Sequence, residues 1–347
     1  LHVVHVILAE LKHSVAQCVG QLQRALHIAL FKKLVAESDI VLENFRPGTL
    51  EKWGIGYEAL KAVNPKLIML RISGYGQTGP YRDKPGFGVV AEAMSGLRHL
   101  TAEPGRVPVR VGVSIGDTLA SLHGVTGILM ALQERSRSGQ GQVIDVALYE
   151  AVFNCMESLL PEYSAFGAVR EAAGSALPGI APSNAYRCKD QGYVLIAGNG
   201  DSIFKRLMKL IGREDLGNDP ELENNDGRVK RVQELDQAIG RWAKTITTDK
   251  ALELLDSVAV PAGRIYTVAD IANDPHYRAR ENIQTIQMQD GSNLEVPGVL
   301  PKLSRTPGSI KTPAPTIGQN TDEILKEIGL NDSQISSLKE RGVAFTQ

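Results

Sequence analysis

The chain has 347 residues with 38 Lys and Arg against 39 Asp and Glu, and 43% of its residues are hydrophobic. This composition excludes global disorder and offers no basic block for nucleic acid, although a few well-placed cations could still bind a phosphorylated cofactor. No uninterrupted apolar stretch approaches the roughly 18 residues of a membrane span, so no membrane association is expected. Three cysteines without a CxxC pair predict neither disulfides nor a metal site and favour the reducing cytoplasm.

Apolar runs alternate with amphipathic segments between residues 31 and 150, a pattern typical of α/β folds with parallel strands. Asp39–Phe45 and Lys66–Ser73 are predicted to be buried strands. Between them, Thr49–Val63 has its large apolar residues at roughly helical spacing and ends before Asn64 and Pro65. The three segments together predict a strand-helix-strand unit.

The next predicted elements lead to an acidic residue at a strand-to-helix junction. Asp117–Arg137 indicates a buried helix that ends at a glycine, Gln142–Leu148 indicates a strand, and Tyr149–Phe166 indicates a helix. Glu150 therefore lies where the strand passes into the helix. Open α/β folds place their chemistry at the carboxyl ends of their strands.

Residues 167–184 are rich in Gly, Ala, Ser and Pro and mark the predicted domain boundary. Beyond it we expect an α+β region with a hairpin at 190–192, an extended Pro-rich connector at 301–320 and a final pair of short helices. The helices predicted for this region are Ser202–Ile211, Val229–Thr245 and Thr248–Val258.

The segment Gly74–Gly79 matches the GxGxxG string after a predicted strand. A dinucleotide fingerprint opens a helix, whereas Pro80, Pro85 and Gly86 interrupt the residues that follow here. A glycine-rich loop near a ligand, or a plain turn, is the preferred interpretation.

Two further segments are open to two interpretations each. Glu43–Gly48 ends a strand with polar, aromatic and cationic residues, which suits a nucleotide or phosphate edge, but an ordinary turn with a solvated Arg46 also fits. Glu150 could form a carboxylate pair with Asp145, Glu157 or Glu162, or could simply favour the helix dipole. No GxSxG elbow supports a serine nucleophile.

Several colinear segments resemble the class III CoA-transferases, which include formyl-CoA transferase, carnitine CoA-transferase and alpha-methylacyl-CoA racemase. They are VAESDIVLENFRPGTLEKWGIGYEALKAVNPKLIMLRISGYGQTGPYRDKPGF, GDTLASLHGVTGILMALQERSRSGQGQVIDVALYEAV, VPAGRIYTVADIANDPHYRAREN and PAPTIGQNTDEILKEIGL. The resemblance implies a Rossmann-like large domain with an open parallel sheet and flanking helices, which we expect to lack its first strands, and a smaller α+β domain. The implied ranges are 1–27 unmatched, 28–170 large CoA-binding domain, 185–300 small domain, and 301–347 connector and terminal helices.

The resemblance implies a CoA-transferase in which Glu150, at a position where the family commonly has Asp, attacks an acyl-CoA. A mixed anhydride and a glutamyl-CoA thioester follow, and a carboxylic acid accepts the CoA; a dicarboxylate such as succinate is the expected acceptor. CoA is thus a substrate and no tightly bound cofactor is expected; the implied assembly is an interlocked homodimer. The implied CoA-binding residues are Asn44, Phe45, Arg46, Lys52, Tyr75 and Lys84, and the implied substrate loop includes Gly179, Ser183 and Asn184.

Two alternatives stay open. The racemase branch moves an alpha proton with a histidine in a Gly-His-Asp turn, where this chain has Gly86-Phe87-Gly88. A catalytically inactive acyl-CoA-binding relative would keep the scaffold without the chemistry. The missing histidine removes one of two bases and ranks racemisation below transfer.

Overall fold

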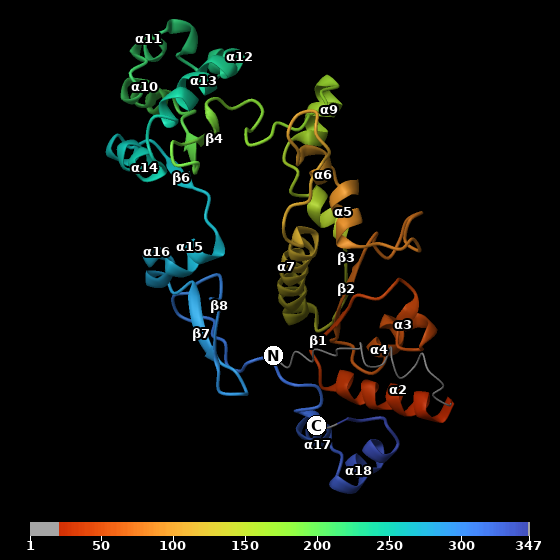
Figure 1. Cartoon of the computed structure of the whole chain (residues 1–347). Helices are drawn as coiled ribbons and strands as arrows, with labels where there is room; N and C mark the ends of the chain where they lie inside the picture. The colour runs from red at the N-terminus through yellow and green to blue at the C-terminus, as the bar shows by residue number, and fades with distance from the viewer. Residues whose placement is uncertain (1–20, 346–347) are drawn as a thin grey trace. The chain divides into compact units, whose positions relative to one another are not determined.

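The computed structural model describes residues 21–345 (Figure 1). The chain forms two compact units. Unit 1 comprises Leu1–Ala102, Val107–Glu171 and Ala314–Gln347, and unit 2 comprises Glu103–Arg106 and Ala172–Pro313. Unit 2 is thus inserted into the sequence of unit 1.

Unit 1 is built on a parallel sheet of β1 (Ile40–Glu43), β2 (Ile68–Ser73) and β3 (Val143–Ala147), in the order β1-β2-β3. Leu42 pairs with Leu70, and Leu70 with Ile144. The predicted α/β class and the three predicted strands are confirmed. Since the strands run parallel, their carboxyl ends meet at one edge of the sheet.

Two layers of helices cover the faces of this sheet. On one face, α2 (Gln21–Ala36) packs with the segment between β1 and β2 in an apolar cluster. On the other, α7 (Ile115–Ser138) lies along β2 and β3 (Figure 1). The approach of α7 requires glycine, because a Cβ at Gly124 would lie 2.8 Å from Leu70 Cδ2.

Two helices predicted as continuous are each divided. Thr49–Val63 forms α3 (Thr49–Lys52) and α4 (Tyr57–Lys61), because Gly54 adopts a left-handed φ of +74° between them. Tyr149–Phe166 forms α8 (Leu148–Phe153) and α9 (Leu159–Phe166), with Glu157 at a φ of +52° in the break. Apolar periodicity continues across both breaks, which is why it did not reveal them.

The helix α7 ends at Gly139 in the left-handed conformation, as predicted, but the expectation that it is buried is wrong. One side of it exposes large apolar side chains. Within residues 21–345 it is the one helix long and apolar enough to cross a membrane by length and composition. One such helix is weak evidence for a membrane span, because core helices of soluble proteins pass the same test. The exposed residues are Leu122, Val125, Leu129 and Met130.

Unit 2 contains an antiparallel sheet of β4 (Ser183–Arg187), β5 (Tyr193–Ala197) and β6 (Ala262–Arg264), with the predicted hairpin turn between β4 and β5. A separate hairpin joins β7 (Ile283–Gln287) and β8 (Asn293–Pro297). The predicted helix Val229–Thr245 is divided into α12 and α13. The helices are α10 (Asp201–Leu210), α11 (Glu214–Gly217), η1 (Pro220–Leu222), α12 (Asn225–Lys230), α13 (Val232–Ala243), α14 (Thr248–Ser257), α15 (Val268–Asn273) and α16 (Pro275–Ala279).

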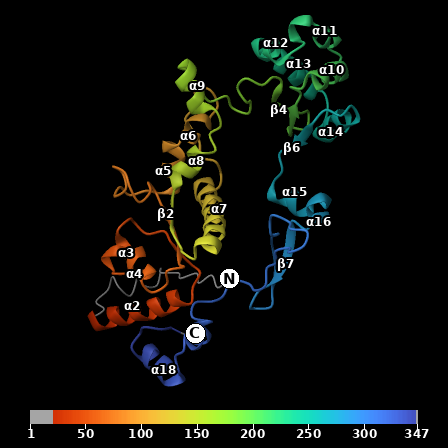
Figure 2. The same ribbon diagram turned by 180° about the vertical axis from the view of Figure 1, so that it is seen from behind.

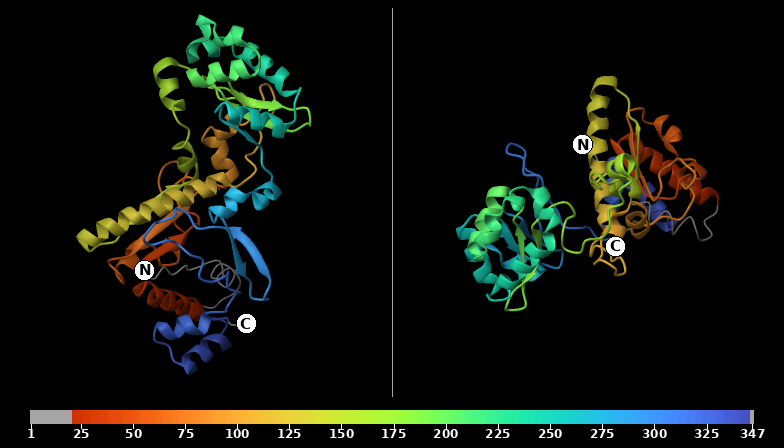
Figure 3. Two further views of the ribbon diagram at one scale, coloured as in Figure 1. Left: turned by 90° about the vertical axis from the view of Figure 1, so that its left-hand side faces the viewer. Right: turned by 90° about the horizontal axis from the view of Figure 1, so that it is seen from above.

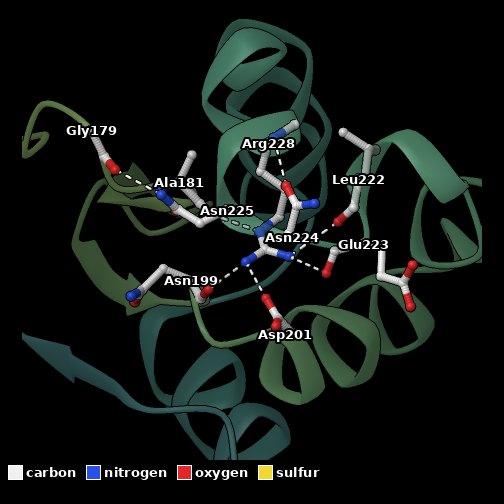
Figure 4. Close-up of polar contacts among 10 residues, drawn as sticks. Gly179, Ala181, Asn199, Asp201, Leu222, Glu223, Asn224, Asn225 and Arg228 are labelled. Carbon is white, nitrogen blue, oxygen red and sulfur yellow. Dashed lines mark hydrogen bonds and ion pairs between the residues drawn. The ribbon is translucent and has the colours of Figure 1, made fainter.

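The guanidinium of Arg228, a residue with no exposed surface, organises the loops of unit 2 (Figure 4). Its five N–H groups all have acceptors, four hydrogen bonds going to backbone carbonyls and one to Asp201 Oδ1 at 2.7 Å. Because every donor is satisfied, this buried cation stabilises the loops without an uncompensated polar group. The carbonyls are those of Ala181, Asn199, Leu222 and Glu223.

The end of the chain returns to unit 1. Residues 301–320 contain no helix or strand and are almost entirely exposed, and α17 (Thr321–Glu327) and α18 (Asp332–Glu340) follow as the predicted pair of short helices. Leu325 and Ile335 pack with Leu30 of α2. Figure 2 and Figure 3 show the terminal helices beside α2.

The remaining helices of unit 1 follow the glycine-rich loop after β2. They are α5 (Gly88–Met94) and α6 (Leu97–Leu100). Helix α5 packs against both α7 and α8. The start of α8 is therefore held by the sheet and by two neighbouring helices.

Candidate active site

Glu150 lies in the first turn of α8, immediately after β3. Leu148, Ala151 and Val152 are buried and fix which side of the helix faces the core. Helical geometry then turns Glu150 outward, and its side chain is exposed. The carboxylate is accordingly reachable from solvent at the carboxyl edge of the sheet, as the sequence predicted.

A row of aromatic rings leads to this carboxylate. The Tyr149 hydroxyl donates to Glu150 Oε1 at 3.1 Å, and the ring of Tyr149 lies 6.3 Å from that of Tyr75. The ring centroids of Tyr75 and Tyr81 lie 5.9 Å apart, and Lys84 Nζ lies 3.7 Å from the centroid of the Tyr81 ring. Two candidates for CoA binding, Tyr75 and Lys84, are therefore connected with the candidate nucleophile through aromatic contacts.

The glycine-rich loop is fixed to the middle of β3 by Asp145. The backbone N–H of Gln77 donates to Asp145 Oδ2 at 2.9 Å, and the N–H of Gly76 donates to Ser73 Oγ at 3.0 Å. No helix opens directly after the loop, since α5 begins only at Gly88. The predicted departure from a dinucleotide fingerprint is confirmed, and the carboxylate of Asp145 serves to hold this loop.

The turn after β1 contains three more of the predicted CoA-binding residues. Asn44 and Arg46 are exposed. Phe45 is half-buried and packs edge-on against Trp53, with 5.3 Å between the ring centroids. The sequence did not connect Arg82 with this turn, yet its guanidinium lies against Gly48, 3.8 Å from where a Cβ would stand. Lys52 is exposed at the end of α3.

An ion triad with two buried members and one partly exposed member, which the sequence analysis missed, packs against this turn. Arg71 donates through Nε to Glu43 Oε1 at 2.6 Å and through Nη1 to Glu51 Oε1 at 2.7 Å. Glu43 also accepts the backbone N–H of Phe45 at 2.7 Å. The triad joins β1, β2 and α3. An arginine inside an apolar strand was the signal that could have revealed it.

The two acids of the triad respond differently to their surroundings. Burial raises the pKa of Glu43, although the hydrogen bond from Arg71 opposes that change. The hydrogen bonds from Arg71 lower the pKa of Glu51, whose side chain is nearly half exposed. Glu51 is therefore the member that holds α3 as a carboxylate at neutral pH.

The predicted substrate-loop residues lie in unit 2, whereas Glu150 lies in unit 1. The carbonyl of Gly179 accepts a hydrogen bond from Asn225 Nδ2 at 2.8 Å, close to the Arg228 network (Figure 4). Asn184 Nδ2 donates to Asp236 at 2.9 Å, and Ser183 pairs with Ala197 in the sheet. Each of the three candidates thus has a hydrogen-bonding or pairing partner within unit 2.

A concavity of about 650 Å³ lies at the opposite edge of the sheet of unit 1. Its lining includes Asp39 and Lys66, which precede β1 and β2, together with Arg135 of α7. The amino ends of parallel strands are not where α/β enzymes bind their substrates, so Glu150 and not this concavity marks the candidate site. Among the described side chains of residues 25–345, no three metal-ligating groups gather to hold an ion.

Comparisons with known proteins identify the family of the chain. The model of CoA-transferase family III matches residues 16–321, so the match begins earlier than residue 28, where the sequence analysis had placed it. The succinyl-CoA–D-citramalate CoA-transferase of Chloroflexus aurantiacus is 46% identical over 91% of this chain and 79% of its own length. The succinate–glutarate CoA-transferase of Agrobacterium fabrum is 33% identical over 86% of this chain and 75% of its own length.

The fold is also found in a solved structure. A CaiB/BaiF family protein from Brucella suis superposes with a TM-score of 0.75 at 35% identity, covering 86% of this chain and 78% of that protein. The resemblance predicted from the colinear segments is confirmed, as is the enzyme class that it implied. The chain belongs to CoA-transferase family III.

Proposed function

We propose that the enzyme transfers CoA from succinyl-CoA to a dicarboxylic acid, with Glu150 as the nucleophile. The observation that carries the proposal is the exposed carboxylate of Glu150 at the end of β3, beside the glycine-rich loop. The names of relatives that use succinyl-CoA or exchange succinate with glutarate support this class of substrate.

The chemistry follows from a carboxylate, which attacks a thioester carbonyl without the help of a general base. Glu150 attacks the succinyl carbonyl, forming a mixed anhydride and releasing CoA thiolate. The thiolate attacks the glutamyl carbonyl, which gives glutamyl-CoA thioester and free succinate. The acceptor carboxylate then attacks this thioester to form a second anhydride, and the returning thiolate attacks the acceptor carbonyl, producing the new acyl-CoA and regenerating Glu150.

The large α/β domain, residues 28–170, would hold CoA along the carboxyl edge of the sheet. Exposed cations suit its phosphates, and the aromatic side chains suit its adenine and pantetheine parts. The turn after β1 offers Arg46, the end of α3 offers Lys52, and the loop after β2 offers Arg82 and Lys84. Asn44, Phe45 and Tyr75 complete this proposed surface, with Gly179, Ser183 and Asn184 of unit 2 as the proposed substrate loop.

Covalent trapping tests the proposed function. The enzyme is incubated with succinyl-CoA, treated with borohydride or hydroxylamine, and digested for mass spectrometry, while a panel of carboxylic acids is screened as acceptors. We expect modification at Glu150 and transfer to dicarboxylates. If the protein bound CoA but showed neither an adduct nor transfer, it would be a catalytically inactive relative. Deuterium entering a 2-methylacyl-CoA from solvent would instead favour an isomerase. The sequence argues against that activity, because Phe87 occupies the position of the racemase histidine.

The proposed assembly is a homodimer with interlocked chains, working in the cytoplasm. Its support is the family resemblance together with the apolar side of α7, where Leu122, Val125 and Leu129 are exposed at helical spacing. Val125→Glu with Leu129→Glu should lower the fraction of dimer recovered after refolding from denaturant, because interlocked folded chains cannot separate; sedimentation or light scattering measures that fraction. An unchanged dimer would place the interface elsewhere.

A further inference from the structure

The hydroxyl of Tyr149 contacts one of the two oxygens of the proposed nucleophile. It donates to Glu150 Oε1 at 3.1 Å, and among the side chains that the structure describes, those of residues 25–345, no other hydrogen bond to the Glu150 carboxylate is present. Oε1 is therefore held by a donor, while Oε2 is left to attack. The inference below rests on the proposed function, since it requires Glu150 to be acylated.

The four steps of transfer divide into two kinds by the carbon that is attacked. In the first and last steps, the substrate carbonyl is attacked. In the second and third, the thiolate or the acceptor attacks the carbonyl of Glu150 itself. If Oε2 becomes the bridging atom of the anhydride, Oε1 remains the carbonyl oxygen and bears the negative charge of both tetrahedral intermediates at Glu150. A donor that already contacts Oε1 is placed to stabilise that charge.

The surroundings of Tyr149 suit a donor that does not lose its proton. Burial raises the pKa of Tyr149 above its ordinary value of 10.0, and the charge of Glu150 and the hydrogen bond to it act in the same direction. The phenol therefore stays protonated across the neutral range. Its ring is half-buried and lies near that of Tyr75, which limits its movement away from Oε1.

We propose that the Tyr149 hydroxyl is a catalytic hydrogen-bond donor that stabilises the oxyanion on Glu150 Oε1 when the glutamyl carbonyl is attacked. It does not act on the steps at the substrate carbonyl. Tyr149 is thus distinct from groups that would bind CoA or the acid, because its target is an atom of the enzyme that becomes part of the intermediate.

The test uses the full chain, succinyl-CoA as the probe and Tyr149→Phe as the variant. Without an acceptor, succinate is released when the thiolate attacks the glutamyl carbonyl, so the burst of succinate measured by rapid quench follows the step that Tyr149 assists. We expect the rate of the burst to fall by about 10- to 100-fold. This loss is smaller than the rate loss that follows removal of an oxyanion-hole donor in an enclosed active site. The final amount of Glu150 adduct and the KM for succinyl-CoA should change by less than about twofold.

Tyr163→Phe is the matched control, because Tyr163 is an exposed tyrosine of α9 outside the proposed binding surface. Its burst should equal that of the unmodified enzyme. An unchanged burst in Tyr149→Phe, with the adduct still formed, would overturn the role of Tyr149 and leave the proposed function intact. A raised KM with an unchanged burst rate at saturation would assign Tyr149 to substrate binding and also overturn the proposal. Absence of both burst and adduct in the unmodified enzyme would reject the proposed function and the role of Tyr149 together.

Discussion

Two charged residues of this enzyme show opposite ways of using a polar group. Arg228 of unit 2 has no exposed surface, and all five of its donors are occupied. Glu150 of unit 1 is exposed, and its carboxylate accepts from Tyr149 at Oε1. A saturated buried group can only maintain the fold, whereas an exposed group with a free oxygen can form a new bond.

The largest expected effect comes from replacing Glu150, the exposed carboxylate with a free oxygen. Glu150→Gln should lower CoA transfer by at least about a thousandfold, because an amide cannot form the anhydride. The melting temperature should stay the same, since the side chain is exposed and the replacement is nearly isosteric. Steady-state transfer from succinyl-CoA and thermal unfolding measure the two quantities.

Glu157→Gln serves as the control for that change, because Glu157 is another exposed acid shortly after α8 and pairs with Arg170. It should retain transfer. Turnover that survives Glu150→Gln would place the nucleophile elsewhere. A large loss in Glu157→Gln would revive the paired-carboxylate interpretation.

The converse change replaces Arg228, whose five hydrogen-bond donors are all occupied. Arg228→Met should lower the free energy of unfolding by about 3 to 5 kcal/mol, because it leaves buried carbonyl groups without donors. Urea unfolding measures the loss. Arg213→Met is the control, since Arg213 pairs with Asp215 at the surface and should cost less than about 1 kcal/mol. Equal losses in the two variants would contradict the structural role given to Arg228.

This contrast also explains how far the sequence could predict the molecule. Strands β1, β2 and β3 and the position of Glu150 were predictable, because apolar runs and turn residues act locally. The approach of Arg82 to Gly48, the exposed side of α7 and the acceptors around Arg228 were not. Each depends on residues distant in the chain, and composition and periodicity carry no information about such partners. The assignment of CoA chemistry came from the resemblance of colinear segments.

The triad beneath the turn after β1 lies between the two extremes, and a smaller effect is expected there. Glu51→Gln removes the partly exposed acid that joins Arg71 to α3. We expect CoA affinity to fall by about 3- to 10-fold and the free energy of unfolding by less than about 1 kcal/mol, because solvent screens a half-exposed pair. Calorimetric titration with CoA and urea unfolding provide the values. Glu58→Gln, an exposed acid in the first turn of α4, is the control and should change neither.

The smallest effect is the pH dependence of that same acid. Hydrogen bonds from Arg71 lower the pKa of Glu51 in the folded state below its ordinary 4.5. A lowered pKa contributes stability above the unfolded value and loses it as the pH falls through the folded value. Burial raises the pKa of Glu43, so its contribution to stability changes with pH in the opposite direction. Both the enzyme and Glu51→Gln contain Glu43, so subtracting their unfolding free energies at each pH cancels that contribution to first order. The difference in unfolding free energy should therefore be constant above about pH 5.5 and shrink below pH 4.5. A difference that grew in acid would show that Glu51 binds Arg71 less strongly when ionised.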